Sequence, residues 1–87
     1  MDLRWIVQKG FNSDLQYQGQ TYHVQTEDWG FDNPFLVSRV YRNGAVVRSV
    51  KTAYQDIFSH ITQNQAENIR LAMQVQHEQI LDLLVSG

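Results

Sequence analysis

The dipeptide Asn43-Gly44 constrains the fold more than any other feature of this chain. It interrupts the apolar-rich stretch 38–50, and a type I′ turn needs the positive φ angles that Asn and Gly tolerate best. The stretch therefore predicts a two-stranded antiparallel hairpin. A two-residue turn also sets the register, and that register places Arg39 directly opposite Arg48. Like charges in this position are unfavourable, so we expect an anion between them.

The two faces of this predicted hairpin, residues 35–52, differ in composition. One face mixes the two arginines with apolar and aromatic side chains, as interface hot spots do: Val37, Arg39, Tyr41, Val46, Arg48 and Val50. The other face has small uncharged residues at its centre, and we expect it to be the core: Leu36, Ser38, Val40, Arg42, Ala45, Val47, Ser49 and Lys51.

A first hairpin precedes it, with predicted strands at 11–17 and 20–28 joined by a two-residue turn. This register puts apolar side chains on one face and pairs Asp14 with His23 on the other. A carboxylate beside a histidine is the skeleton of general-base catalysis. No serine or cysteine nucleophile stands beside the pair, however, and an exposed sheet face offers no pocket. We therefore expect an ordinary cross-strand pair, no catalytic residue and no enzyme.

Two capping-box patterns, at 52–55 and 62–65, predict a short helix at about 53–60 and a long helix at 63–85. In the long helix, residues spaced by three and four form one face that we expect to be core: Ala66, Ile69, Met73, His77, Ile80 and Leu84. Leu71 and Val75 lie nearly opposite that face, where they are candidates to seat a second helix or a second copy.

These elements predict one α+β domain over residues 1–87, a four-stranded antiparallel meander followed by a short helix and a long C-terminal helix packed on one sheet face. Residues 1–9 alternate in polarity and form either an extra strand or an arm. Because a single helix covers only one face, the second hairpin is left with apolar side chains on the other face.

Three aromatic residues crowd the connection between the hairpins and the strand that follows it: Trp29, Phe31 and Phe35. Either they plug the end of the core, which we favour, or they form an exposed aromatic knob for a partner.

The three histidines, at positions 23, 60 and 77, fall on different predicted elements without the spacing of metal ligands. We therefore expect no metal and no other cofactor, and we interpret His77 as a hydrogen-bonded core histidine.

The amino-acid composition argues against several kinds of site and of protein. The chain has no cysteine, which excludes disulfides and cysteine-based zinc sites. The absence of a long apolar run predicts no membrane span and no signal peptide, so we expect a cytoplasmic protein. The net charge of −2 argues against a protein built around nucleic acid, although four of the seven basic side chains lie in the second hairpin.

Three stretches, TYHVQTEDWG, NPFLVSRVYRNGAVVRSVKTAY and QHEQILDLLVSG, resemble a family of small uncharacterised bacterial proteins with an aromatic-HVQTED strand, a glycine-turn hairpin and a C-terminal helix. The resemblance covers residues 10–87. It implies a cytoplasmic bacterial domain and assigns no activity or catalytic residue. Asn43 replaces the first glycine of the Gly-Gly turn that is typical of the family.

We therefore expect a small adaptor or regulatory module that binds a protein, or a second copy of itself, through the exposed face of the second hairpin. In a competing interpretation, Glu27, Asp28 or a helix carboxylate neutralises the arginines within the fold. The alternative function is a weak nucleic-acid or phosphate binder that uses the basic hairpin. Nucleic-acid affinity falls steeply with salt, whereas an apolar interface does not behave in this way.

Overall fold

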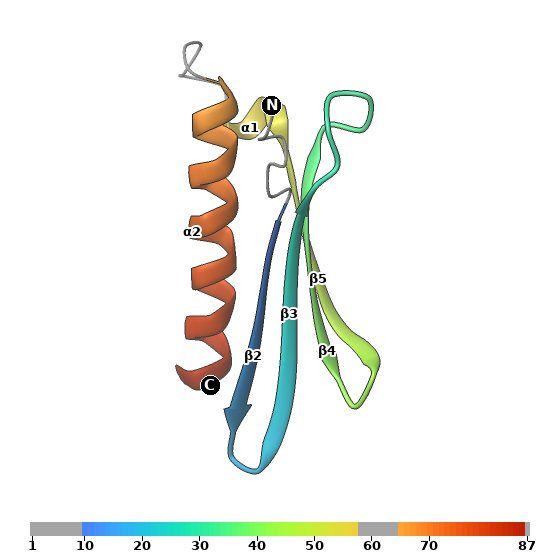
Figure 1. Ribbon diagram of the computed structural model, residues 1–87, viewed down its shortest axis with the longest axis vertical. Coiled ribbons are helices and arrows are strands. Elements are labelled where there is room, and N and C mark those ends of the chain that lie inside the picture. The colour runs from blue at the N-terminus through green and yellow to red at the C-terminus, as the bar shows by residue number, and fades with distance from the viewer. Residues whose placement is uncertain (1–9, 58–64, 87) are drawn as a thin grey trace, which may run out of the picture.

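In a computed structural model, which describes residues 10–57 and 65–86, a four-stranded antiparallel sheet carries one long helix (Figure 1). The strands lie side by side in chain order: β2 (Gly10–Tyr17), β3 (Gln20–Asp28), β4 (Phe35–Arg42) and β5 (Ala45–Ala53). They are followed by α1 (Tyr54–Ile57) and α2 (Gln65–Ser86). This architecture confirms the predicted α+β meander. The extra strand or arm predicted for residues 1–9 lies outside the described residues.

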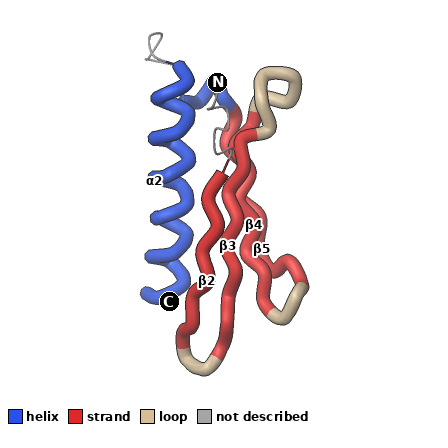
Figure 2. The backbone as a smooth tube through the Cα atoms, viewed as in Figure 1, coloured by secondary structure: helices blue, strands red, loops and turns tan. Residues whose placement is uncertain are grey.

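Helix α2 forms a second layer on one side of the sheet (Figure 2). It packs mainly on β3 and β2 and only marginally on β4. The side of the sheet that faces away from α2 is called the open face below, because no described helix covers it. On the helix side, the described residues of α2 meet β5 mainly at Val50 and Thr52.

The core between α2 and the sheet consists of two apolar clusters. The first gathers Leu36, Tyr54, Ile69 and Met73, with Phe11, Ile57 and Ala72 packed against it. The second gathers Val24, Val40 and Ile80, with Tyr22, Val50, Leu81 and Leu84 packed against it. Alternate residues of the strands and one face of the helix supply these side chains, as amphipathic elements do.

The first hairpin has the predicted register. Its turn residues Gln18 and Gly19 have φ angles of 52° and 78°, as a type I′ turn requires. Asp14 lies opposite His23, and Leu15 lies opposite Tyr22. The polar and apolar faces are therefore those that the alternation predicts.

The second hairpin has the predicted turn but not the predicted register. Asn43 has a φ of 55°, and Tyr41 lies opposite Val46 as expected. A β-bulge then shifts the ladder by one residue, so that Arg48 lies opposite Val40. Arg39 lies opposite Ser49 instead of Arg48. The predicted arginine pair is therefore wrong, because one extra residue on β5 moves the second arginine to the other side of the sheet.

The bulge also exchanges the faces of β5 beyond Val47. The predicted core face is confirmed on β4, where Leu36, Ser38 and Val40 are buried. On β5 the prediction is wrong, because Val50 and Thr52 lie opposite Ser38 and Leu36 on the helix side, while Ser49 and Lys51 lie on the open face.

The helices differ from their predictions mainly at their starts. Thr52 belongs to β5 and its hydroxyl donates to the Gln76 side chain, so it does not cap α1, which begins at Tyr54. The second predicted cap, at residue 62, lies outside the described residues. The predicted core face of α2 is confirmed for Ile69, Met73, His77 and Ile80, and Leu84 packs at its edge. Ala66 is exposed, contrary to the prediction.

The core assignment of α2 predicts a large effect at Ile80. This side chain is buried in the second cluster, so Ile80→Ala should reduce the free energy of unfolding by about 2–5 kcal/mol. Leu83→Ala is the matched control, since Leu83 is 58% exposed and its loss should change stability by less than about 0.5 kcal/mol. Urea unfolding of both variants measures the difference. Equal effects would show that the helix is turned differently.

Candidate functional site

The open face is divided into two halves of different character. The half formed by β2 and β3 is polar and carries Asp14, His23, Gln25 and Glu27. The half formed by β4 and β5 is basic and apolar, and its side chains are Phe35, Val37, Arg39, Tyr41, Val46, Ser49 and Lys51.

Trp29, which follows β3, lies over the basic half between two cations. The Arg39 guanidinium is 5.6 Å from the centre of the Trp29 ring, and the Lys51 ammonium is 5.3 Å from it. The same ammonium is 4.3 Å from the centre of the Phe35 ring. All three contacts are within the range of cation–π attraction. Trp29, Phe35, Arg39 and Lys51 therefore form one basic and aromatic cluster, which we call the Trp29 patch.

The carboxylates next to the Trp29 patch accept hydrogen bonds from uncharged groups. Glu27 accepts hydrogen bonds from Gln25 (2.9 Å) and from the Trp29 indole (3.3 Å). Asp28 accepts one bond from the Tyr54 hydroxyl and another from the Gly30 amide. Within the described residues neither carboxylate forms an ion pair with a cation of the patch, contrary to the interpretation in which Glu27 or Asp28 neutralises the arginines.

The predicted partner-binding residues do not all share a face. Arg39, Tyr41 and Val46 lie on the open face, and so does Val37, which is only 5% exposed. Arg48 and Val50 lie on the helix side of β5, where Val50 packs against the second apolar cluster. The bulge is the reason for both errors. The sequence interpretation also omitted Lys51, which it assigned to the core face.

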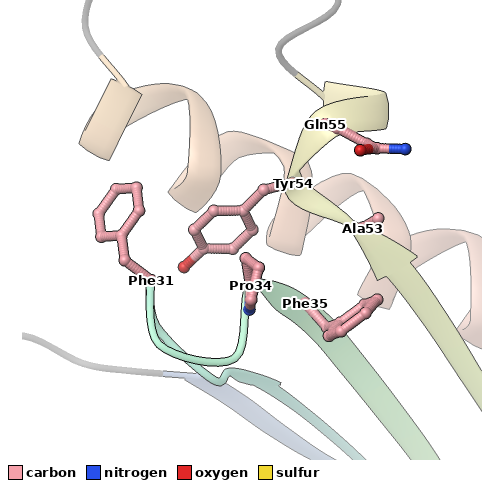
Figure 3. A pocket seen from close by; sticks show the side chains of 6 residues that line it. All are labelled: Phe31, Pro34, Phe35, Ala53, Tyr54 and Gln55. Atoms are coloured by element: carbon pink, nitrogen blue, oxygen red, sulfur yellow. The ribbon is translucent and has the colours of Figure 1, made fainter.

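The aromatic residues after β3 do not plug the core as we favoured. Phe31 is 68% exposed and meets the Tyr54 ring edge-on, with the ring centres 5.1 Å apart. Tyr54 itself fills that end of the core, and the burial of its hydroxyl beside Asp28 raises the pKa of the phenol. An open hollow lies next to these rings (Figure 3), lined by Phe31, Pro34, Phe35, Ala53, Tyr54 and Gln55.

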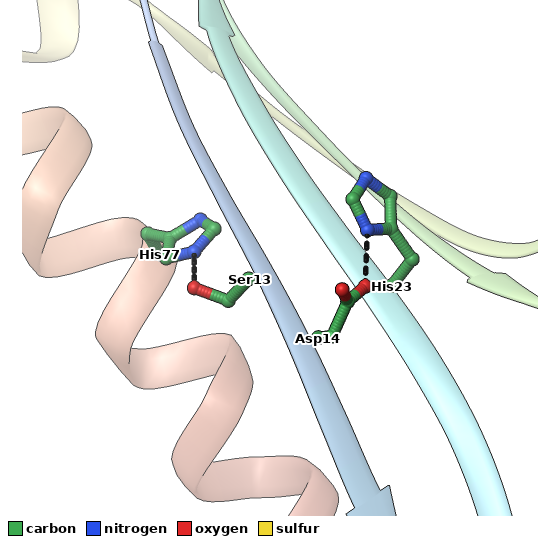
Figure 4. Close-up of polar contacts among 4 residues, drawn as sticks. All are labelled: Ser13, Asp14, His23 and His77. Atoms are coloured by element: carbon green, nitrogen blue, oxygen red, sulfur yellow. Dashed lines mark hydrogen bonds and ion pairs between the residues drawn. The ribbon is translucent and has the colours of Figure 1, made fainter.

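Asp14 and His23 form the predicted cross-strand pair on the open face. The Asp14 carboxylate is 2.8 Å from Nδ1 of His23, and the Tyr41 ring lies beside the imidazole, with the ring centres 5.9 Å apart. Figure 4 shows this pair on the side of β2 opposite to His77. The Asp14 side chain is 78% exposed and the His23 side chain 41%, and among the described residues no serine hydroxyl is hydrogen-bonded to this imidazole. The geometry is that of a hydrogen-bonded pair on the surface.

The sequence interpretation missed a chain of hydrogen bonds that crosses all four strands beneath α2. From β5 to β2 its members are Thr52, Gln76, Ser38, Thr26, His77 and Ser13, linked by distances of 2.6, 2.8, 2.6, 2.8 and 2.9 Å. Thr26, Ser38, Gln76 and His77 are buried. This polar chain separates the two apolar clusters. The signal in the sequence is the hydroxyl at one core-facing position of each strand.

A neutral His77 satisfies every link of the polar chain in one direction. The Thr52 hydroxyl donates to the Gln76 carbonyl, and the Gln76 amide donates to Ser38. Ser38 can then donate to Thr26, Thr26 to Nδ1 of His77, and Nε2–H to Ser13. Protonated His77 would have to donate at both nitrogens, which reverses the Thr26–Ser38 link and leaves the Ser38 proton without its acceptor.

No group of three or more potential metal ligands occurs within residues 10–57 and 65–86. In the same part of the chain, no helix is long and apolar enough to cross a membrane. Comparisons with protein-family models, curated proteins and solved structures gave no match. The case for a function therefore depends on the geometry of the open face and of the edge strands.

The buried histidine predicts that acid destabilises the fold. Burial lowers the pKa of His77 below 6.5, an effect that Glu78 opposes and His23 reinforces. The unfolded chain therefore takes up a proton at a higher pH than the folded chain does. Stability should be full above pH 6.5 and fall as the pH drops below that value, by up to about 1.4 kcal/mol per pH unit.

This contribution can be isolated with two variants measured by urea unfolding between pH 8 and 5. His77→Gln should show a smaller loss of stability at low pH than the wild type shows. His23→Gln should keep most of the loss caused by His77, because burial is the largest cause of the lowered pKa and His23 only a smaller one. An unchanged pH profile in His77→Gln would mean that this histidine is not held neutral in the core.

Proposed function

We propose that this chain is a small protein-binding module whose Trp29 patch binds an acidic surface of a partner protein. The observation that carries the proposal is that no described carboxylate forms an ion pair with the two cations of the patch. Arg39 and Lys51 lie against aromatic rings and form no ion pair with the described carboxylates, while Glu27 is held by Gln25 and Trp29. The positive charge of the patch can therefore interact with acidic groups of a partner.

The architecture of the patch favours recognition of protein. Trp29 is fixed between two cations and by its bond to Glu27, so little side-chain entropy is lost when a partner packs on it. Tryptophan and arginine are the residues most enriched among binding hot spots. The guanidinium is positioned beside the ring, where it can bind a carboxylate in bidentate fashion.

Single-stranded nucleic acid is the alternative ligand, because it also binds to aromatic and basic sheet faces. Two features of this chain favour protein over nucleic acid as the ligand. Asp14 and Glu27 occupy its other half and would repel a phosphate backbone that crosses the sheet. The chain also has a net charge of −2, which opposes long-range attraction of a polyanion.

Selection from a displayed peptide library tests the proposal without knowledge of the natural partner. The wild type should enrich peptides in which Asp or Glu accompanies aliphatic or aromatic residues. Binding of a selected peptide should change the fluorescence of Trp29, which is the only tryptophan in a Trp5→Phe background. The double variant Arg39→Gln with Lys51→Gln should weaken binding by about tenfold, as two exposed charge pairs contribute about 0.2–1 kcal/mol each.

The double variant Arg42→Gln with Arg70→Gln is the matched control. It removes the same charge from two exposed arginines outside the patch and should bind with nearly wild-type affinity. Equal losses in both variants would indicate non-specific charge attraction and contradict the proposal. Tighter binding of oligonucleotides than of any peptide, with a steep dependence on salt, would favour the nucleic-acid alternative.

A further inference from the structure

β5 is an edge strand of the described sheet, and no described strand lies on its outer side. It pairs with β4 alone in the described sheet, so its outward backbone groups have no strand partner among the described residues. The bulge at Val47 disrupts the first part of the strand, and bulges of this kind discourage pairing at an edge. Residues 49–53 continue with a regular ladder to β4 and form the part of the edge that can accept another strand.

On the helix side, a shallow and mainly apolar groove reaches this part of β5 at Thr52. Its other walls are Ile57 of α1 and a row of α2 residues that includes the polar side chains Asn68, Gln76 and Gln79 beside Leu71, Ala72 and Val75. Leu71 is 57% exposed although it lies in the middle of the helix. The groove exists because α2 packs mainly on β3 and β2 and approaches β5 at Thr52.

On the open side, the same strand is flanked by positive charge. Lys51 belongs to the Trp29 patch and points away from α2. Successive residues of a strand point to opposite faces, so a segment paired with β5 would present alternate side chains to the groove and to Lys51.

We propose that the β5 edge binds an extended segment of the partner protein in which apolar and acidic residues alternate. The apolar side chains of this added strand occupy the groove beside α2, and its carboxylates lie next to Lys51. This inference rests on the proposed function and adds the manner of binding to it. Strand addition of this type combines main-chain hydrogen bonds with side-chain pockets.

The groove is within reach of such a segment. The Thr52 hydroxyl is 2.6 Å from the Gln76 carbonyl oxygen, so α2 approaches β5 closely at this end of the strand. A further strand would lie about 4.8 Å beyond β5. A leucine or phenylalanine at a helix-side position could therefore contact both Leu71 and Val75, which line the groove.

A second copy of this chain fits the edge less well than an acidic segment does. Two β5 strands placed side by side would bring Arg48 and Lys51 of both copies together without a carboxylate on that strand. Pairing of β5 with β2 of another copy is a head-to-tail contact, which builds rings or open chains of molecules and not a two-fold dimer. Both arrangements would appear in sedimentation velocity as self-association without added peptide.

The test uses the full chain and a synthetic peptide of nine residues, the length of β5, with Leu and Glu alternating between capped ends. The control peptide has the same composition with its glutamates and leucines in separate blocks. The alternating peptide should bind and protect outward amides of β5 from hydrogen exchange. Methylation of the peptide nitrogens that face β5 should weaken binding by about tenfold or more, since each methyl group removes a main-chain hydrogen bond. Methylation of the intervening nitrogens should be tolerated.

Two substitutions on the protein, one of them with a matched control, separate the contribution of the groove to peptide binding from the contribution of the positive charge. Leu71→Gln should weaken binding several-fold, whereas Leu83→Gln should not, because Leu83 is equally exposed on α2 but does not line the groove. Lys51→Glu should reverse the preference, so that a peptide with alternating Leu and Lys binds better than the acidic one.

The outcomes distinguish this inference from the proposed function. Acidic peptides that depend on Arg39 and Lys51 but tolerate methylation at every position would overturn strand addition and leave the Trp29 patch as the binding site. Loss of all dependence on these two cations would overturn both. Self-association of the chain through β5, detected by protection of the same amides without peptide, would replace the partner segment by a second copy.

Discussion

A single extra residue on β5 decides what each side of the second hairpin presents. Because Val47 has no residue opposite it, the strand resumes its ladder with Arg48 beside Val40. Val50 then packs in the core, and Lys51 lies beside Trp29 on the open face. Without the bulge, a lysine would point toward α2 and a valine toward solvent. The core and the candidate binding surface therefore depend on the same local irregularity.

The position of α2 depends on the polar chain as much as on apolar burial. Apolar contacts are non-directional and would tolerate a sliding or rotated helix. The bonds from Gln76 to Ser38 and Thr52, and from His77 to Thr26, have strict geometry and lose most of their value if the helix moves. Buried groups left without partners would cost about 1–3 kcal/mol each. This requirement fixes the helix in its position across the sheet and so maintains the groove beside β5.

Much of the fold followed from local signals in the sequence. The turn pairs Gln18-Gly19 and Asn43-Gly44 predicted both hairpins, since positive φ angles are required at those positions and few residues accept them. The alternation of polar and apolar residues then gave the correct faces of β2, β3 and β4, and the Asp14–His23 pair followed from the register. The helical period identified the buried side of α2 at Ile69, Met73 and Ile80.

The errors in β5 and at Trp29 have one physical origin, because in both places long-range packing selects between two conformations that the local sequence allows. The sequence of β5 alternates acceptably in either register, and contact with the helix, which is remote in sequence, selects the one that buries Val50. Trp29 could pack inward or fold over the sheet, and two cations brought together by the bulged register hold it on the open face. No pattern local to Trp29 or to Lys51 contains that information.

The β-bulge also affects how selectively the edge of β5 can pair with another strand. A long, flat edge strand pairs with almost any exposed strand and invites aggregation. Here the bulge and Arg48 disturb the first half of the edge, while the second half has an apolar groove on one side and Lys51 on the other. A segment that pairs with this short stretch gains few main-chain hydrogen bonds, so its side chains must supply much of the affinity. The same feature that protects the domain from indiscriminate pairing therefore makes recognition depend on the sequence of the added strand.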